Sequence, residues 1–157
     1  MKNKNLNGPL RRHLIHAILL GIVLSLTWAG LVYFVLKSPA RQSYDYWTAE
    51  ASPWRIASQY QAEDSKLQVI ELVNGAGGPL FLEDVELNGT NGNSSLPTHP
   101  SIRFESKESM TLLLPLQTGC QANETYQYSL HITYSGQENA SASETEDGRL
   151  PVYGICE

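Results

Sequence analysis

An uncharged apolar run of 23 residues, from Leu14 to Leu36, lies near the N-terminus of this 157-residue chain. As a helix it would be roughly 35 Å long, enough to cross a hydrocarbon core of about 30 Å. A secretory signal usually has a shorter apolar stretch of about 7 to 15 residues before a small-residue cleavage site. The nearest candidate site, Ser38-Pro39-Ala40, contains a proline. The run therefore predicts a retained transmembrane helix over residues 14–36, and a cleaved signal is the alternative.

The basic residues around this run predict its orientation. Two basic residues follow the run closely, Lys37 and Arg41, whereas four precede it: Lys2, Lys4, Arg11 and Arg12. Because basic flanks stay on the cytoplasmic side, residues 1–13 are expected to form a cytoplasmic basic segment. The protein is then expected in the cell membrane or in a surface appendage, with residues 38–157 extracellular.

Small side chains recur every fourth residue inside the run, at Ala17, Gly21, Ser25 and Ala29. Residues four apart share one helix face, and small residues there let a second helix approach closely in lipid. Since small residues are common in membrane helices, a chance register is the alternative. The pattern predicts a helix-packing face toward other copies of this chain or other membrane helices, besides contact with lipid.

The charge of the larger part of the chain limits its partners. Residues 37–157 carry 7 basic and 16 acidic side chains, and 7 − 16 gives a net charge of −9. Binding of nucleic acid depends on Lys and Arg that neutralise phosphates. Nucleic acid is therefore not expected as a partner, whereas envelope proteins remain open as partners.

Potential glycosylation sites point to an exported domain. The motif Asn-x-Ser/Thr occurs at Asn88, Asn93, Asn123 and Asn139. An asparagine in this motif is the acceptor for N-linked glycans in exported proteins. Accidental motifs in a Ser/Thr-rich chain are the alternative. The pattern predicts a glycoprotein.

The two cysteines, Cys120 and Cys156, both follow the apolar run. An even number of cysteines in an exported domain is typical of a disulfide, so we expect these two to pair. A metal site is not expected, because two cysteines this far apart and the isolated His99 and His131 match no ligand spacing. No cofactor is expected either.

Strand patterns dominate the second half of the chain. In ETYQYSLHITY, over residues 124–134, apolar and polar residues alternate with the period of a half-buried strand. The stretches KLQVIELV (66–73) and LFLEDVEL (80–87) flank NGAGGP, which predicts a hairpin. Further strands are expected in SIRF, in MTLLLPL, where Pro115 favours an edge or an end, and in RLPVYGI. The fold class predicted is mainly β: a transmembrane α-helix followed by a small antiparallel immunoglobulin-like or pilin-like β-sandwich over residues 65–157.

Residues 37–64 are expected to form an aromatic-rich segment between the membrane and the sandwich. The five rings there are Tyr44, Tyr46, Trp47, Trp54 and Tyr60. They are expected at the headgroup layer or over one end of the sandwich, with contact to a neighbouring subunit as the alternative.

Motifs of catalysis are missing from this sequence. It has no Gly-x-Ser-x-Gly, no His-Glu-x-x-His, no phosphate-binding glycine loop and no calcium loop of alternating acids. The acid pairs, such as Asp84 with Glu86, are expected at solvated strand edges and turns. An enzymatic role is not expected.

In layout the chain resembles archaeal type IV pilin-like proteins and archaellum-associated surface proteins, and the strand texture of KLQVIELVNGAGGPLFLEDVELNGT and YSLHITYSG is similar. The resemblance implies an exported β-sandwich on an apolar helix, with helices bundled in a filament core. Two features depart from pilin precursors: Gly8 is followed by Pro9, and the fifth position after Gly8 is His13 rather than Glu. Archaellum stator proteins, which do not require a filament-forming helix, fit about as well.

These features predict a structural subunit of a cell-surface filament or envelope assembly that packs through its apolar helix. One alternative is a single-pass anchored binding domain, stator-like or adhesive. The other is an accessory subunit of a membrane complex.

Overall fold

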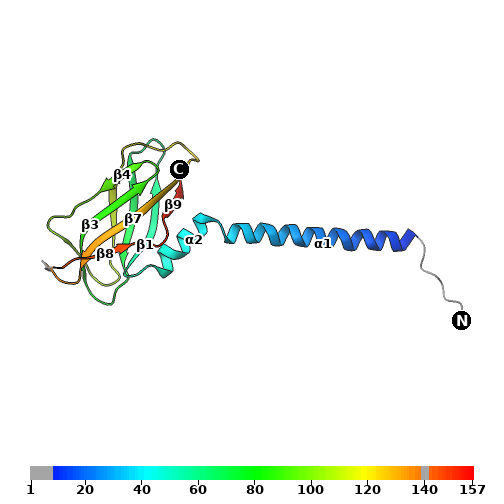
Figure 1. The fold of residues 1–157 in the computed structure, drawn as a ribbon, viewed down its shortest axis with the longest axis horizontal. Helices are drawn as coiled ribbons and strands as arrows, with labels where there is room; N and C mark the ends of the chain where they lie inside the picture. The colour runs from blue at the N-terminus through cyan, green and yellow to red at the C-terminus, as the bar shows by residue number, and fades with distance from the viewer. Residues whose placement is uncertain (1–8, 139–141) are drawn as a thin grey trace. The chain divides into compact units, whose positions relative to one another are not determined.

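The computed structural model of this protein describes residues 9–138 and 142–157, with side chains from residue 13 onward. Helix α1 covers Pro9–Leu36, helix α2 Pro39–Asp45 and the π-helix η1 Tyr46–Glu50 (Figure 1). The strands are β1 Trp54–Gln61, β2 Leu67–Asn74, β3 Leu80–Gly89, β4 Gly92–Ser95, β5 Ile102–Phe104, β6 Ser109–Pro115, β7 Thr125–Ser135, β8 Glu144–Asp147 and β9 Val152–Ile155. The chain divides into two compact units, with the boundary between Ser38 and Pro39. We call residues 39–157 the β domain.

Helix α1 contains the predicted apolar run and starts earlier, at Pro9. Proline suits the first helical turn, because its missing N–H has no partner there in any case. Residues His13–Leu36 have a mean hydropathy of 2.3, and none of the most apolar stretch is buried within the described chain. By length and composition this N-terminal helix is long and apolar enough to cross a membrane, and a signal sequence meets the same criteria.

The described strands of the β domain form two antiparallel sheets. The smaller sheet has the order β1-β2-β6. The larger sheet has the order β4-β3-β7-β8, with β5 also paired to β3 and β9 to β7. The mainly-β class with an N-terminal helix, predicted from sequence, is confirmed, and the arrangement is sandwich-like.

Strand β7 follows the predicted alternation. Its core-facing residues are all buried: Tyr126, Tyr128, Leu130, Ile132 and Tyr134. Apolar side chains of β2 and β6 join the same core, including Ile70, Leu72, Leu112 and Leu114. Trp54 of β1 is fully buried and makes edge-to-face contacts with Phe104 at 5.1 Å and Tyr134 at 5.9 Å between ring centroids. Such pairs add to the burial of apolar surface that stabilises the domain.

The predicted hairpin of β2 with β3 is wrong. Both strands exist, but β2 pairs with β1 and β6, and β3 pairs with β4, β5 and β7. The NGAGGP segment therefore carries the chain from one sheet to the other. Asn74, at its start, is buried and donates hydrogen bonds to the carbonyls of Gly78 and Phe104, which fixes the crossing. The prediction for Pro115 is confirmed: it ends β6, which is an edge strand.

The expected division into a segment 37–64 and a sandwich 65–157 also differs from the structure. The β domain begins at Pro39, because α2, η1 and β1 pack into it. Tyr46, Trp47 and Trp54 are buried core residues, whereas Tyr44 and Tyr60 are 58% and 48% exposed. Three of the five rings thus serve the core rather than a headgroup layer.

Candidate functional site

The small-residue face of α1 is the first candidate site. Ala17, Gly21, Ser25 and Ala29 are exposed within the described chain, and a β-carbon on Gly21 would meet no atom within 4 Å. The Ser25 hydroxyl donates a hydrogen bond to the Gly21 carbonyl at 2.8 Å. The hydroxyl is therefore satisfied inside the helix and places no unpaired polar group on the face. The packing role of these residues stays a prediction.

The segment between α1 and β1 is fixed to a distant part of the chain. We call residues 39–50, which comprise α2 and η1, the strap; it lies against β1 and β9 (Figure 1). The Ser43 hydroxyl donates to the Pro151 carbonyl at 2.6 Å, and the Trp47 indole N–H donates to the Leu150 carbonyl at 2.9 Å. The backbone N–H of Arg149 donates to the Tyr46 hydroxyl at 3.0 Å. The strap is therefore an integral part of the β domain.

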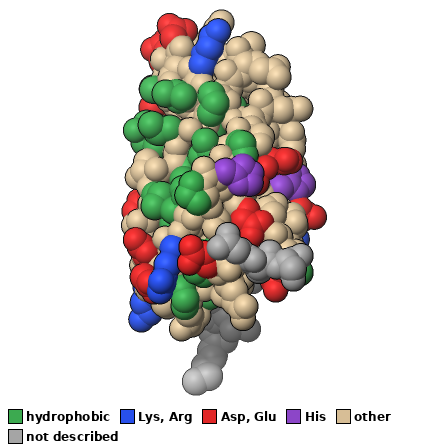
Figure 2. Space-filling model, turned by 90° about the vertical axis from the view of Figure 1, so that its left-hand side faces the viewer, with side chains coloured by type: hydrophobic (Ala, Val, Ile, Leu, Met, Phe, Trp, Pro, Cys, Tyr) green, Lys and Arg blue, Asp and Glu red, His purple; other side chains and the backbone are tan. Residues whose placement is uncertain are grey.

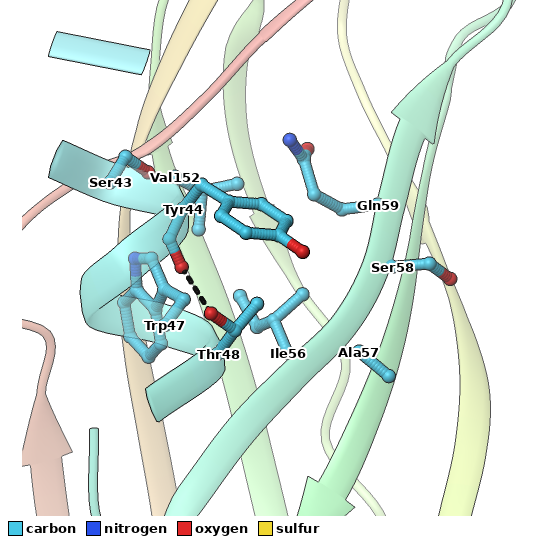
Figure 3. A pocket seen from close by; sticks show the side chains of 9 residues that line it. All are labelled: Ser43, Tyr44, Trp47, Thr48, Ile56, Ala57, Ser58, Gln59 and Val152. Carbon is cyan, nitrogen blue, oxygen red and sulfur yellow. Dashed lines mark hydrogen bonds between the residues drawn. The ribbon is translucent and has the colours of Figure 1, made fainter. Parts of the chain in front are cut away.

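A hollow of about 260 Å³ lies between the strap and β1 (Figure 3). Its lining residues are Ser43, Tyr44, Trp47, Thr48, Ile56, Ala57, Ser58, Gln59 and Val152. Figure 3 shows the Tyr44 ring reaching from the strap toward β1, with its hydroxyl on the β1 side. At this point of β1, the register of its pairing with β2 shifts between Ile56 and Ser58. Ala57 therefore forms a β-bulge.

Most polar side chains around the hollow already have partners. The Thr48 hydroxyl donates to the Tyr44 carbonyl, and the Ser58 hydroxyl donates to the Glu71 carboxylate. The Gln59 amide donates to the Tyr153 carbonyl, and its oxygen accepts from the Tyr126 hydroxyl. A ligand in this hollow would therefore be held mainly by apolar contact.

The predicted disulfide between Cys120 and Cys156 is confirmed, with a Cα–Cα distance of 6.2 Å and both cysteines buried. Backbone hydrogen bonds surround it: Glu157 N–H donates to the Gln61 carbonyl at 3.2 Å, and Glu63 N–H donates to the Glu157 carbonyl at 2.6 Å. The C-terminal residues therefore join the end of β1, in one sheet, to the segment before β7, in the other. We call this connection the C-terminal staple.

Sequence reasoning missed a buried polar network between the sheets. Gln61 is fully buried; its oxygen accepts from the Tyr128 hydroxyl at 3.0 Å and from the Asn91 amide at 3.3 Å. Burial raises the pKa of Tyr126 and of Tyr128, and hydrogen bonds with neighbouring amide side chains oppose that change only in part. Glutamines in a strand pattern look like solvent-facing residues, so no local signal identified this network.

Polar side chains cover the outer face of the larger sheet. His131 on β7 lies opposite Glu86 on β3 and Asp147 on β8, with 2.5 Å between its Nδ1 and an Asp147 oxygen. In Figure 2, the histidine side chains lie together on one side of the view, whereas acidic side chains are spread over both sides. No three His, Cys, Asp or Glu side chains in the described parts of the chain are arranged to hold a metal ion.

Tyr134 and Glu144 pair at the edge of this sheet. The Tyr134 hydroxyl donates to the Glu144 carboxylate at 3.0 Å. Burial, followed by this carboxylate, raises the pKa of Tyr134 to about 12. Burial and the charge of Asp147 raise the pKa of Glu146 as well. The Tyr134–Glu144 hydrogen bond joins β7 to the edge strand β8.

The predicted glycan acceptors fall in different surroundings. Asn88 on β3 is half-buried and Asn93 on β4 is exposed, and the two lie directly opposite each other in one hairpin. Asn123 is exposed in the turn before β7. Asn139 lies outside the described residues.

No protein-family model matches this chain, and no curated protein matches it. The function of the protein is therefore inferred from its own residues.

Proposed function

We propose that this protein is a structural subunit of a cell-surface assembly. Helix α1 holds the chain in the membrane and packs against other copies or other membrane helices. The β domain is displayed outside as an immunoglobulin-like or pilin-like sandwich. The chain also resembles archaeal pilin-like and archaellum-associated proteins in layout, and this resemblance agrees with the proposal.

The observation that carries this proposal is the exposed apolar surface of α1. Its large side chains, such as Leu24, Trp28 and Phe34, are 60%, 71% and 76% exposed. Lipid or other helices must cover such a surface, since soluble proteins rarely leave a large apolar patch open. In lipid, helices associate through close packing, which the face of Ala17, Gly21, Ser25 and Ala29 permits.

The chemistry of the β domain supports its placement outside the cytoplasm. A disulfide persists in oxidising compartments and is rare in the cytosol. Basic residues in front of the run favour retention of the N-terminus in the cytoplasm.

The packing face is tested by two glycine substitutions in the full-length protein in its membrane. Gly21→Leu fills the face, whereas Gly30 lies nine residues further on, roughly 180° around the helix, so Gly30→Leu is the matched control. At either position, an added β-carbon would have no neighbour atom within 4 Å in the described chain outside the adjoining helix backbone. Chemical crosslinking should yield far less oligomer for Gly21→Leu and as much as wild type for Gly30→Leu. Equal oligomer in both variants would overturn the packing role.

Retention of the helix is tested separately by the intact mass of the protein extracted from cell membranes. A mass that includes residues 14–36 supports the anchor. A mass that begins near Ala40 would identify the run as a cleaved signal and would remove the basis for assembly through α1.

The hollow beside Tyr44 favours a second candidate, a membrane-anchored binding domain. This candidate predicts that residues 39–157 capture an envelope protein without α1. Removal of residues up to Lys66 would not test it, because β1 would be lost from the smaller sheet. Matched capture experiments with the wild-type β domain and with Tyr44→Ala should differ if the hollow is used; equal capture would exclude it.

A further inference from the structure

We propose that, of the three described Asn-x-Ser/Thr motifs, Asn123 is the N-glycan acceptor of the folded β domain. The inference rests on the proposed function, because it requires the β domain to be exported. The three sites have the same sequence motif, so only their surroundings in the structure distinguish them.

The turn at Asn123 presents the whole motif to solvent. Asn123 and Thr125 are exposed, and neither side chain makes a hydrogen bond to the described residues. The Asn123 N–H donates to the Cys156 carbonyl at 3.1 Å, which fixes the backbone of the turn while its amide side chain stays accessible.

The backbone conformation of the turn explains why an asparagine stands at position 123, but it does not explain the threonine at position 125. Asn123 has a φ of 63°, in the left-handed region where asparagine is enriched among non-glycine residues. That preference says nothing about position 125. Thr125 begins β7 with its side chain exposed, so packing of the core does not require a hydroxyl there. A free hydroxyl two residues after the asparagine is what the glycosylation motif requires.

The fold restricts the access of a glycosyltransferase to the motif at Asn88. Asn88 lies in the middle of the larger sheet, opposite Asn93 on β4 and Ser129 on β7. Its motif hydroxyl, on Thr90, donates to the Gln127 carbonyl at 3.2 Å and accepts from the Gln127 N–H at 3.1 Å. A glycosyltransferase would have to break these bonds to reach the motif.

The motif at Asn93 is restricted in a similar way. Its hydroxyl, on Ser95, donates to the Asp84 carboxylate at 3.1 Å. Side chains directly opposite in an antiparallel pair have β-carbons about 4.5–5.5 Å apart, so a glycan on Asn93 would be crowded by Asn88. Asn123 has no such neighbour within the described turn.

The modification is a group transfer from a lipid-linked oligosaccharide phosphate. The amide nitrogen of Asn123 attacks the anomeric carbon of the first sugar and forms the N–C bond. The bond from that carbon to the phosphate oxygen breaks, and the lipid phosphate leaves with the electron pair. The amide nitrogen gives up one proton to a basic group of the glycosyltransferase, and nothing is oxidised or reduced.

A glycan at Asn123 would stand beside the C-terminal staple, since its acceptor residue is bonded to the carbonyl of Cys156. The end of the β domain that contains the disulfide would then face solvent and carry the glycan.

The test is glycopeptide mass spectrometry on the full-length protein recovered from the cells that make it. Peptides with Asn123 should carry the sugar mass, and peptides with Asn88 or Asn93 should not. Asn123→Gln should remove that mass, and Asn88→Gln, the matched control, should leave it unchanged. Thr125→Ala, which keeps Asn123 in its turn, should remove it as well.

A second measurement on the same cells separates this inference from the proposed function. A membrane-impermeant amine reagent should label the β domain from outside. Labelled protein with a bare Asn123, or with glycan on Asn88 or Asn93 instead, overturns the inference and leaves the proposed function standing. Protein that is not labelled from outside overturns the proposed function, and the inference fails with it.

Discussion

The ring of Trp47 occupies the space that a side chain at position 148 would need: a β-carbon on Gly148 would lie 2.2 Å from Cζ2 of Trp47. The two residues belong to distant segments, the strap and the loop between β8 and β9. The indole cannot move away freely, because its N–H is bonded to the Leu150 carbonyl. Close approach at this glycine therefore fixes the strap onto the domain.

Gly148→Ala should destabilise the β domain, because either the indole or the loop must shift. Overpacking of this kind costs about 1–3 kcal/mol. Urea unfolding of residues 39–157 measures the change. Gly77→Ala is the control, since a β-carbon there meets no described atom within 4 Å and its change should stay within about 0.5 kcal/mol. Equal stability of both variants would contradict the packing described for Trp47.

Replacement of both Cys120 and Cys156 by Ala should lower the free energy of unfolding by about 2–5 kcal/mol. The loss has two sources: the unfolded chain gains freedom, and the C-terminal staple loses its covalent bond. Denaturant unfolding checks it. Reductant should produce a similar loss in the wild type and no further loss in the double variant; a further loss there would point to a different cause.

Gln61→Met should cost about 1–3 kcal/mol, although the two side chains are similar in size. The substitution leaves the buried Tyr128 hydroxyl and Asn91 amide without their acceptor. Tyr128→Phe should then cost less in the Gln61→Met background than in the wild type, because the hydroxyl has already lost its partner. Gln137→Met, at an exposed position, is the control. Additive losses would show that the network is not coupled.

Tyr134 should titrate with a pKa of about 12, chiefly because it is buried and secondly because it faces Glu144. Its pKa in the unfolded chain is about 10, so its contribution to stability is fully present below about pH 10 and is lost as the pH rises toward 12. A ¹³Cζ NMR titration measures the pKa directly.

Glu144→Gln is the matched variant for this titration, because it removes the charge and keeps an oxygen that can accept the hydrogen bond. The pKa of Tyr134 should fall in this variant and stay above the ordinary tyrosine value, since the burial remains. An unchanged pKa would remove the role assigned to the carboxylate.

Local periodicity predicted strands where each strand is regular. The alternation of Tyr126, Tyr128 and Leu130 is continuous, so β7 was predicted correctly. Strand β1 was missed, because the bulge at Ala57 breaks its alternation and places two exposed residues in succession. Strand β8 reads as four polar residues, because it contributes little to the core.

Pairing between distant segments was beyond reach of the sequence patterns. The turn residues from Asn74 to Pro79 suit a hairpin and a crossing between sheets equally well, and the choice depends on which strands complete each sheet. Burial of Tyr46 and Trp47 likewise depends on Arg149 and Leu150, about a hundred positions away. The disulfide was accessible from sequence only because the chain has two cysteines.

Only Lys37 and Ser38 separate α1 from the strap, and this shortness has a mechanical consequence. A pull between α1 and the β domain would enter at Pro39 and place tension on the hydrogen bonds from Ser43 and Trp47 to the carbonyls of residues 151 and 150. Those carbonyls immediately precede β9, which ends at the disulfide. A load applied at Pro39 would therefore be shared by the first and last parts of the β domain.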